Sequence, residues 1–205
     1  MLTLFTRQAG AALRMLLVAT VALGLAYPLA VWAVAHAPGL APRAEGSVIH
    51  AADGTPAGSS LIGIDPVPAD PAHDPYFHTR PSASAEDVLG PGDPSTSGGS
   101  NKGGFDEDLI AAVQQRRDAI AQREGVAPDQ VPPDAVTASA SGVDPHISPE
   151  YAQLQVPRVA RVTGLTEERV WELVAASTQH AVLGIFGADG VNVTELNLAV
   201  ARQGG

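Results

Sequence analysis

The sequence predicts an α+β fold, with one N-terminal transmembrane helix followed by a loop-rich soluble domain of short strands and about four helices. Residues 15–42 contain no Asp, Glu, Lys or Arg. The chain also carries 21 glycines and 17 prolines, which are typical of long loops. In its second half, apolar residues recur at helical spacing behind capping residues.

The predicted membrane helix is the apolar run of residues 15–34. At about 1.5 Å per residue, twenty residues cross a hydrocarbon core of roughly 30 Å. Tyr27 and Trp32 lie near its far end, where an aromatic belt is expected. Pro28 is expected to kink the last turn, which a membrane helix tolerates.

Arg7 and Arg14 precede this run, and the positive-inside tendency places them in the cytoplasm. We therefore predict a single-pass protein of the cell inner membrane. Its predicted parts are a short cytoplasmic N-terminus (1–12), a transmembrane helix (13–35) and a soluble extracytoplasmic domain (36–205).

A cleaved signal peptide is the alternative. Residues 33–35 (AVA) and 35–37 (AHA) both have the small-x-small form of a cleavage site. The apolar run is longer than the roughly 7–15 residues of a signal core, which favours a retained anchor. With its signal removed, the chain would be an exported soluble binding protein or hydrolase.

Charge and cysteine content exclude several classes of protein. All 22 carboxylates lie in the soluble part, residues 36–205, together with ten of the twelve basic residues, so this part has a net charge of −12. A nucleic-acid partner is therefore not expected, because backbone binding needs a basic patch. The chain has no cysteine, which excludes disulfides and thiolate metal sites.

The first part of the soluble domain is predicted to be strands and loops. Residues 47–50 and 59–64 favour short strands on either side of the turn Asp53-Gly54. Residues 65–75 and 82–104 are rich in proline, glycine, serine or aspartate, which predicts loops.

The helices follow. Residues 106–124 predict an amphipathic helix, with acids in the first turn and Gly125 behind it. Residues 136–141 favour a short strand. Ser148 is a predicted cap for a helix that begins at Pro149 and ends near Val162, and Pro157 is expected to kink or break it.

Thr166 is the predicted cap of the next helix. Its expected buried stripe is Val170, Leu173 and Val174. Residues 191–193 predict a last short element and residues 194–202 a final helix.

A glycine-rich loop precedes the helix at residue 106. It contains Ser97, Gly98, Gly99, Ser100 and Asn101. Such backbone can cradle a phosphate before a helix, so these residues are weak candidates for a nucleotide contact. The chain has no G-x-x-x-x-G-K-[ST] motif, and a plain flexible loop is the alternative.

Two further clusters have simple structural explanations. Ser139, Ser141, Asp144 and His146 suggest a hydrolase, but no G-x-S-x-G elbow is present and Asp-Pro is a turn signal. We therefore assign no catalytic residue.

His73, Asp74 and His78 could ligate a metal, but Pro75 would break any helix that aligned them. We assign no metal site.

Six segments in the soluble part together resemble the C subunit of the bacterial Kdp potassium-transporting P-type ATPase. They are residues 58–63 (GSSLIG), 76–83 (YFHTRPSA), 97–101 (SGGSN), 136–149 (VTASASGVDPHISP), 155–160 (QVPRVA) and 191–198 (VNVTELNL). They occur in the family's order over essentially the whole soluble part. The Tyr27-Pro28 pair late in the membrane helix fits as well.

The resemblance implies a non-catalytic accessory subunit of a high-affinity potassium-import complex. Its implied partners are a channel-like A subunit, a P-type ATPase B subunit, a small F-type peptide subunit and membrane lipid. The family's C subunit is needed for assembly and is described as a chaperone that raises the ATP affinity of the pump subunit. No cofactor of its own is implied; ATP would be shared with the pump subunit.

Two sets of residues are candidates for partner contacts. We expect residues 76–81 and 136–148 to pack together and present Tyr76, Arg80, Asp144 and His146, because loops rarely hold such residues without a reason. In the membrane helix, Ala22 and Ala26 lie four residues apart on a face of small residues, which favours close helix packing.

Overall fold

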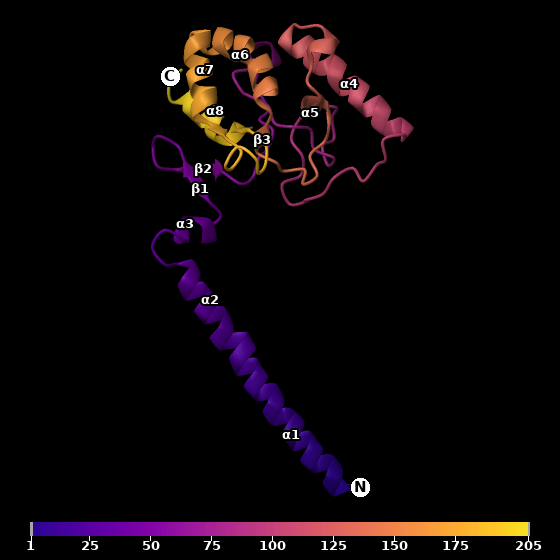
Figure 1. The fold of residues 1–205 in the computed structure, drawn as a ribbon, viewed down its shortest axis with the longest axis vertical. Coiled ribbons are helices and arrows are strands. Elements are labelled where there is room, and N and C mark those ends of the chain that lie inside the picture. The colour runs from indigo at the N-terminus through magenta and orange to yellow at the C-terminus, as the bar shows by residue number, and fades with distance from the viewer. Residues whose placement is uncertain (1, 205) are drawn as a thin grey trace. The chain divides into compact units, whose positions relative to one another are not determined.

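The computed structural model describes residues 2–204 (Figure 1). Their internal contacts divide into two compact units, with the boundary between Ser47 and Val48. The mixture of helices and short strands confirms the predicted α+β class.

The first unit consists mainly of helix. α1 (Leu2–Val21) leads through a π-helical turn, η1 (Ala22–Ala26), into α2 (Tyr27–Ala35), and the short α3 (Ala41–Ala44) follows. Among the described residues, one helical stretch, Phe5–Ala35, is long and apolar enough to cross a membrane.

The π-helical turn lies just before Pro28, whereas the sequence predicted a kink in the last turn of the helix. Proline has no N–H to donate to the carbonyl of Gly24. The Tyr27 N–H instead reaches back five residues to the Ala22 carbonyl, which widens the turn.

In the second unit, four longer helices form the core. They are α4 (Glu107–Glu124), α6 (Pro149–Thr163), α7 (Glu167–Ala176) and α8 (Val193–Ala201). α6 packs against α4 and α7, and α7 packs against α8. The largest side chains buried between them and the adjoining loops are Phe77, Ile120, Ile147, Tyr151 and Leu196.

The predicted helix ends are confirmed. Side chains of Asp106, Ser148 and Thr166 accept N–H bonds in the first turns of α4, α6 and α7. Gly125 and Gly164 then end α4 and α6 in the left-handed conformation.

α6 continues unbroken through Pro157, so the expected break is absent from this helix. Pro157 and Gln153 are both exposed. The carbonyl that loses its helical N–H partner therefore lies on the solvent side, where water replaces the bond.

Two small antiparallel sheets complete the unit. β1 (Val48–His50) pairs with β2 (Pro56–Ser59), and a second sheet has the order β3-β5-β4. Its strands are β3 (His146–Ile147), β4 (Thr178–Gln179) and β5 (Gly190–Asn192).

Two predicted strands were wrong. The strand expected at residues 59–64 lies earlier, at Pro56–Ser59, because Asp53 closes a tight turn by accepting the Thr55 N–H and pairing begins directly after it. Residues 136–141 form no strand, since α5 (Pro133–Val136) occupies the start of that segment. Farther along, Ser139 and Ser141 side chains accept the N–H groups of the following turn. Residues 65–75 and 82–104 are loops as expected, apart from one short turn, η2 (Pro71–His73).

Candidate functional site

Arg80 joins two loops that are nearly sixty residues apart in the chain. Its Nη2 donates to the carbonyls of Thr137 (3.3 Å) and Ala138 (3.4 Å), and its Nη1 lies 3.5 Å from Oδ2 of Asp144. Close by, the N–H of Ser139 donates to the carbonyl of Pro81 (3.0 Å). The expectation that residues 76–81 and 136–148 pack together is therefore confirmed.

Asp144 also fixes the position of His146. The Asp144 Oδ1 accepts the N–H of His146 (2.9 Å) and lies 3.5 Å from its ring Nδ1. This arrangement turns the chain at Pro145 and delivers His146 into β3, where it pairs with Asn192 of β5. The ring then lies beside the start of β5, since its atoms would contact a Cβ added at Gly190.

These three residues line one cavity of about 470 Å³. Arg80, Asp144 and His146 form one side with Asp134 and Ser148, and the loop between β4 and β5 supplies the rest. We call this cavity the Arg80 cleft. Among the described residues, Arg80 Nε and His146 Nε2 are buried polar atoms without a hydrogen-bond partner. Buried polar groups are usually paired, so Arg80 Nε is suited to an acceptor on another molecule, and His146 Nε2 to a donor or an acceptor according to its tautomer.

The serines around the cleft serve the fold. Ser139 and Ser141 hydroxyls accept backbone N–H bonds from Gly142 (2.7 Å) and Val143 (3.2 Å). Ser148 caps α6 and donates to Asp134 (2.8 Å). None of these contacts links a serine to His146.

Of the three residues considered for a metal, His73 lies apart from the other two. Exposed His73 contacts Asp70 (Nδ1 to Oδ2, 2.6 Å). Asp74 and His78 are buried, with His78 between Asp74 (2.7 Å) and Asp65 (3.1 Å). Within residues 2–204, no group of three or more His, Cys, Asp or Glu side chains could hold a metal ion.

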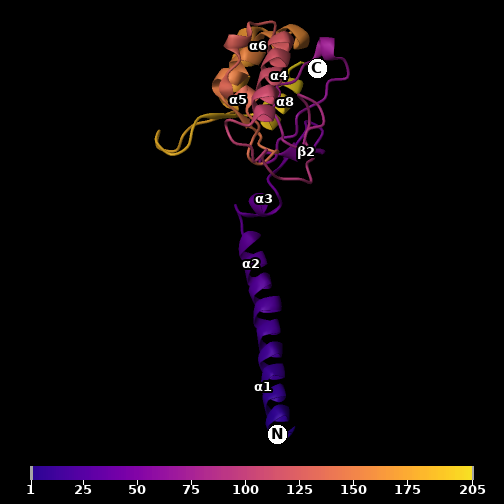
Figure 2. The ribbon, with the colours of Figure 1, turned by 90° about the vertical axis from the view of Figure 1, so that its right-hand side faces the viewer.

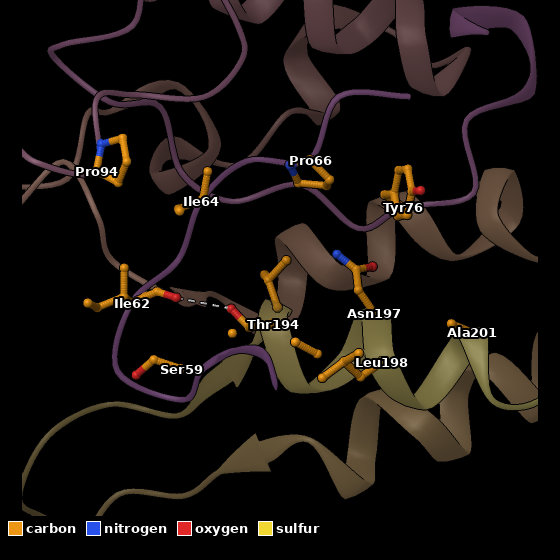
Figure 3. Close-up of a pocket in the computed structure, with 13 residues that line it drawn as sticks. Ser59, Ile62, Ile64, Pro66, Tyr76, Pro94, Thr194, Asn197, Leu198 and Ala201 are labelled. Atoms are coloured by element: carbon orange, nitrogen blue, oxygen red, sulfur yellow. Dashed lines mark hydrogen bonds between the residues drawn. The ribbon is translucent and has the colours of Figure 1, made fainter. Parts of the chain in front are cut away.

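Tyr76 does not reach the Arg80 cleft. It lines a separate groove of about 490 Å³, between the loop after β2 and α8 (Figure 3). The groove is largely apolar because its polar groups bond within the fold: the Asn197 side chain binds both backbone groups of Phe77, and Thr194 donates to the Ile62 carbonyl.

The glycine-rich loop packs beside the turn that leads to the cleft. The N–H of Gly98 donates to the carbonyl of Ser141 (2.9 Å), and Gly99 lies close to Ala140. Ser97, Ser100 and Asn101 are exposed. Non-glycine Asn101 has a φ of 53°, a left-handed conformation that Asn tolerates well.

The start of α4, which this loop precedes, is already occupied. The Asp106 carboxylate accepts the N–H groups of Asp108 (3.0 Å) and Leu109 (3.1 Å). The bond from Leu109, followed by that from Lys102, holds the pKa of Asp106 below its usual value. A carboxylate of the chain therefore fills the position that a bound phosphate would need.

Ala22 and Ala26 begin and end the π-helical turn, and both are exposed. The structure leaves them accessible to other helices.

One feature escaped the sequence analysis. The β4–β5 hairpin carries four large apolar side chains, Val182, Leu183, Ile185 and Phe186, and all are exposed. The only sequence signal was an uncharged run of residues 181–188, which is also compatible with a buried strand.

At the base of the hairpin, Asp189 accepts the N–H of Ala181 (2.9 Å) and lies 3.0 Å from the His180 ring. The bond from Ala181, followed by that from His180, lowers the pKa of Asp189, so this rim of the cleft stays negatively charged.

Comparisons with known proteins agree over nearly the whole chain. The family model described as "KdpC: K+-transporting ATPase, c chain" matches residues 9–202. A Kineococcus radiotolerans protein named potassium-transporting ATPase KdpC subunit is 50% identical over 200 residues, covering 97% of this chain and 95% of its own. Proteins of the same name from Caulobacter vibrioides (47% over 182 residues; 88% and 86% covered) and Bradyrhizobium diazoefficiens (43% over 206 residues; 96% and 97%) are similar too.

Proposed function

Since the chain belongs to the KdpC family of K+-transporting ATPase c chains, we propose that it is a membrane-anchored accessory subunit of an ATP-driven potassium-import complex. The candidate span Phe5–Ala35 supports an anchored role. The partners would be the channel-like and pump subunits, with a small peptide subunit beside them.

One observation carries the proposal for the soluble unit: Arg80, Asp144 and His146 converge on a cleft in which two buried nitrogens lack partners within the described chain. A carboxylate or carbonyl of a partner subunit would accept a hydrogen bond from Arg80 Nε, and from His146 Nε2 when that nitrogen carries the proton. Such charge-assisted bonds are about twice as strong as neutral ones and specify orientation. The cleft thus supports a role in assembly.

In this role the chain has no nucleotide chemistry of its own. An influence on the ATP affinity of the pump subunit would be transmitted by subunit contacts, since the start of α4 is filled by Asp106. Assembly and ATP affinity can therefore be tested separately.

Co-purification tests the proposal. A tagged full-length chain is expressed with the other ATPase subunits, and their recovery is measured for wild type, Arg80→Ala and His146→Ala. Removing a buried partner of a charged interfacial pair costs roughly 2–5 kcal/mol, so recovery should fall sharply. Arg169→Ala is the matched control, because the Arg169 side chain is 43% exposed and pairs with Glu172 on the surface of α7. Full recovery with both cleft variants would refute the assignment of the cleft.

A further inference from the structure

The β4–β5 hairpin ends in a compact apolar tip, residues 182–186. The hairpin projects from the body of the soluble unit in Figure 2 as the gold loop. Val182 and Phe186 exchange backbone hydrogen bonds of 2.9 and 3.0 Å, so the tip has a defined shape. The exposed fractions are 65% for Val182, 83% for Leu183, 76% for Ile185 and 66% for Phe186.

The fold does not explain the residue at its turn. Leu183 has a φ of 56° and Gly184 a φ of 71°. Residues with a side chain rarely adopt this left-handed conformation, and Gly or Asn is the usual choice. Leu183 stays in it although most of its side chain is in water. Strained positions of this kind cluster at functional sites.

Charge argues against a lipid surface as the contact. The chain has no Lys or Arg between residues 170 and 201, and the hairpin base carries Asp189. The soluble part has a net charge of −12, and anionic headgroups attract basic segments. Arg80 is the cation that faces the hairpin across the cleft, and it is already close to Asp144.

Size and charge also argue against a second copy. A stable interface buries about 800 Å² on each partner, more than a five-residue tip supplies. Two copies would in addition repel each other. The tip is therefore suited to a small apolar pocket within a larger interface. Val182 and Phe186 also line the Arg80 cleft, which makes the tip continuous with that surface.

We propose that residues 182–186 insert into an apolar pocket, rimmed by Lys or Arg, on another subunit of the same ATPase. The inference rests on the proposed function and assigns the anchor of that interface. Apolar anchors in desolvated pockets carry much of the energy of interfaces, and the acidic rim of Asp189, Asp144 and Asp134 complements a basic one.

The test variant is Leu183→Asn, because Asn tolerates the left-handed backbone while removing the apolar side chain. A purely structural role predicts unchanged or higher stability and unchanged binding. The docking role predicts an intact fold but at least about tenfold weaker binding of the tagged full-length chain to the remaining subunits. Ile185→Thr should act in the same direction. Phe105→Thr is the matched control, since Phe105 is 99% exposed on another loop.

Photo-crosslinking identifies the contact directly. Benzoylphenylalanine replaces Leu183 in the full complex in its native membrane, and the same probe at Phe105 is the control. An adduct between position 183 and another ATPase subunit supports the inference, while adducts only with lipid or with a second copy overturn it. If the wild-type chain recovers the other subunits and both tip variants recover them equally well, the docking inference is overturned but the proposed function is not. Failure of the wild-type chain to recover them would overturn the proposed function.

Discussion

Arg158 of α6 reaches Asp74, 84 residues earlier in the chain, with its Nη1 3.0 Å from the Asp74 Oδ2. Both side chains are buried. The same Nη1 donates to the carbonyls of Asp74 (2.8 Å) and Tyr76 (2.9 Å). The remaining guanidinium nitrogens bind the buried Glu124 carboxylate of α4. One arginine therefore fastens the long loop before Arg80 to two helices of the core, and so positions the cleft.

Arg158→Met should strongly destabilise the soluble unit. The substitution removes the cation that the Asp74 and Glu124 carboxylates share, leaving His78 beside Asp74 and Arg123 beside Glu124. Breaking a buried pair costs about 3–5 kcal/mol. Arg161→Met, on the exposed face of the same helix, is the matched control. Urea unfolding of both variants measures the difference in stability. Equal unfolding midpoints would show that Arg158 does not hold the loop to the helices.

Stability should fall at acid pH through Asp74. Burial alone would raise the pKa of Asp74, but the hydrogen bond from His78 and the charges of His78 and Arg158 outweigh burial and hold the pKa below its ordinary value. A lowered folded-state pKa gives stability that is complete above the unfolded pKa of about 4 and is lost as pH falls through the folded value. Unfolding free energies measured from neutral pH downward should therefore show a smaller acid loss in Asp74→Asn than in wild type. An identical acid loss in Asp74→Asn would contradict this role.

Gly63→Ala should disturb the turn at Asp144 and Pro145, which forms part of the Arg80 cleft. A Cβ at Gly63 would lie 2.6 Å from the Asp144 carbonyl oxygen and 2.6 Å from the Pro145 Cα, which are both backbone atoms. Relief of such a clash costs about 1–3 kcal/mol and would move Asp144 away from Arg80. Gly103→Ala, with nothing within 4 Å of its Cβ, is the control. Thermal melting and subunit recovery should both fall for Gly63→Ala only.

The full-length chain alone should bind ATP weakly and should not hydrolyse it. Asp106 fills the first turn of α4, and Lys102, near the glycine-rich loop, pairs with Asp106 and Asp108. Calorimetry of the detergent-solubilised chain should detect no micromolar affinity. A micromolar dissociation constant would revive residues 97–101 as a nucleotide contact.

The face of small residues on the membrane helix, which contains Ala22 and Ala26, should be needed for assembly. Ala22→Leu with Ala26→Leu keeps the helix apolar but adds bulk where close packing is expected, so the double variant should insert and yet recover fewer partner subunits. Ala11→Leu with Ala12→Leu adds the same bulk at the other end of the helix. Equal recovery and equal growth at low potassium for both pairs would show that the soluble unit alone holds the complex.

Local sequence patterns predicted the helices because their signals are local. Asp106, Ser148 and Thr166 cap the first turns with side chains only two or three residues away, and Gly125 and Gly164 adopt a backbone conformation that they favour anywhere. Strands were predicted less well, because a strand forms only where a partner strand pairs with its backbone N–H and C=O groups. Residues 59–64 had the right composition, but β1 pairs with residues 56–59 instead.

The sequence by itself therefore determined the apolar span, the capped helices, the acidic charge and the ordered motifs of the family, all of which depend on neighbouring residues. It also indicated that residues 76–81 and 136–148 meet. Only the tertiary structure decided that Arg80 and His146 share a cleft while Tyr76 lies in another groove, and that residues 182–186 face solvent. The physical reason is that burial belongs to the packed chain: an apolar run such as residues 181–188 is compatible with a core strand or an exposed tip until its neighbours are in place.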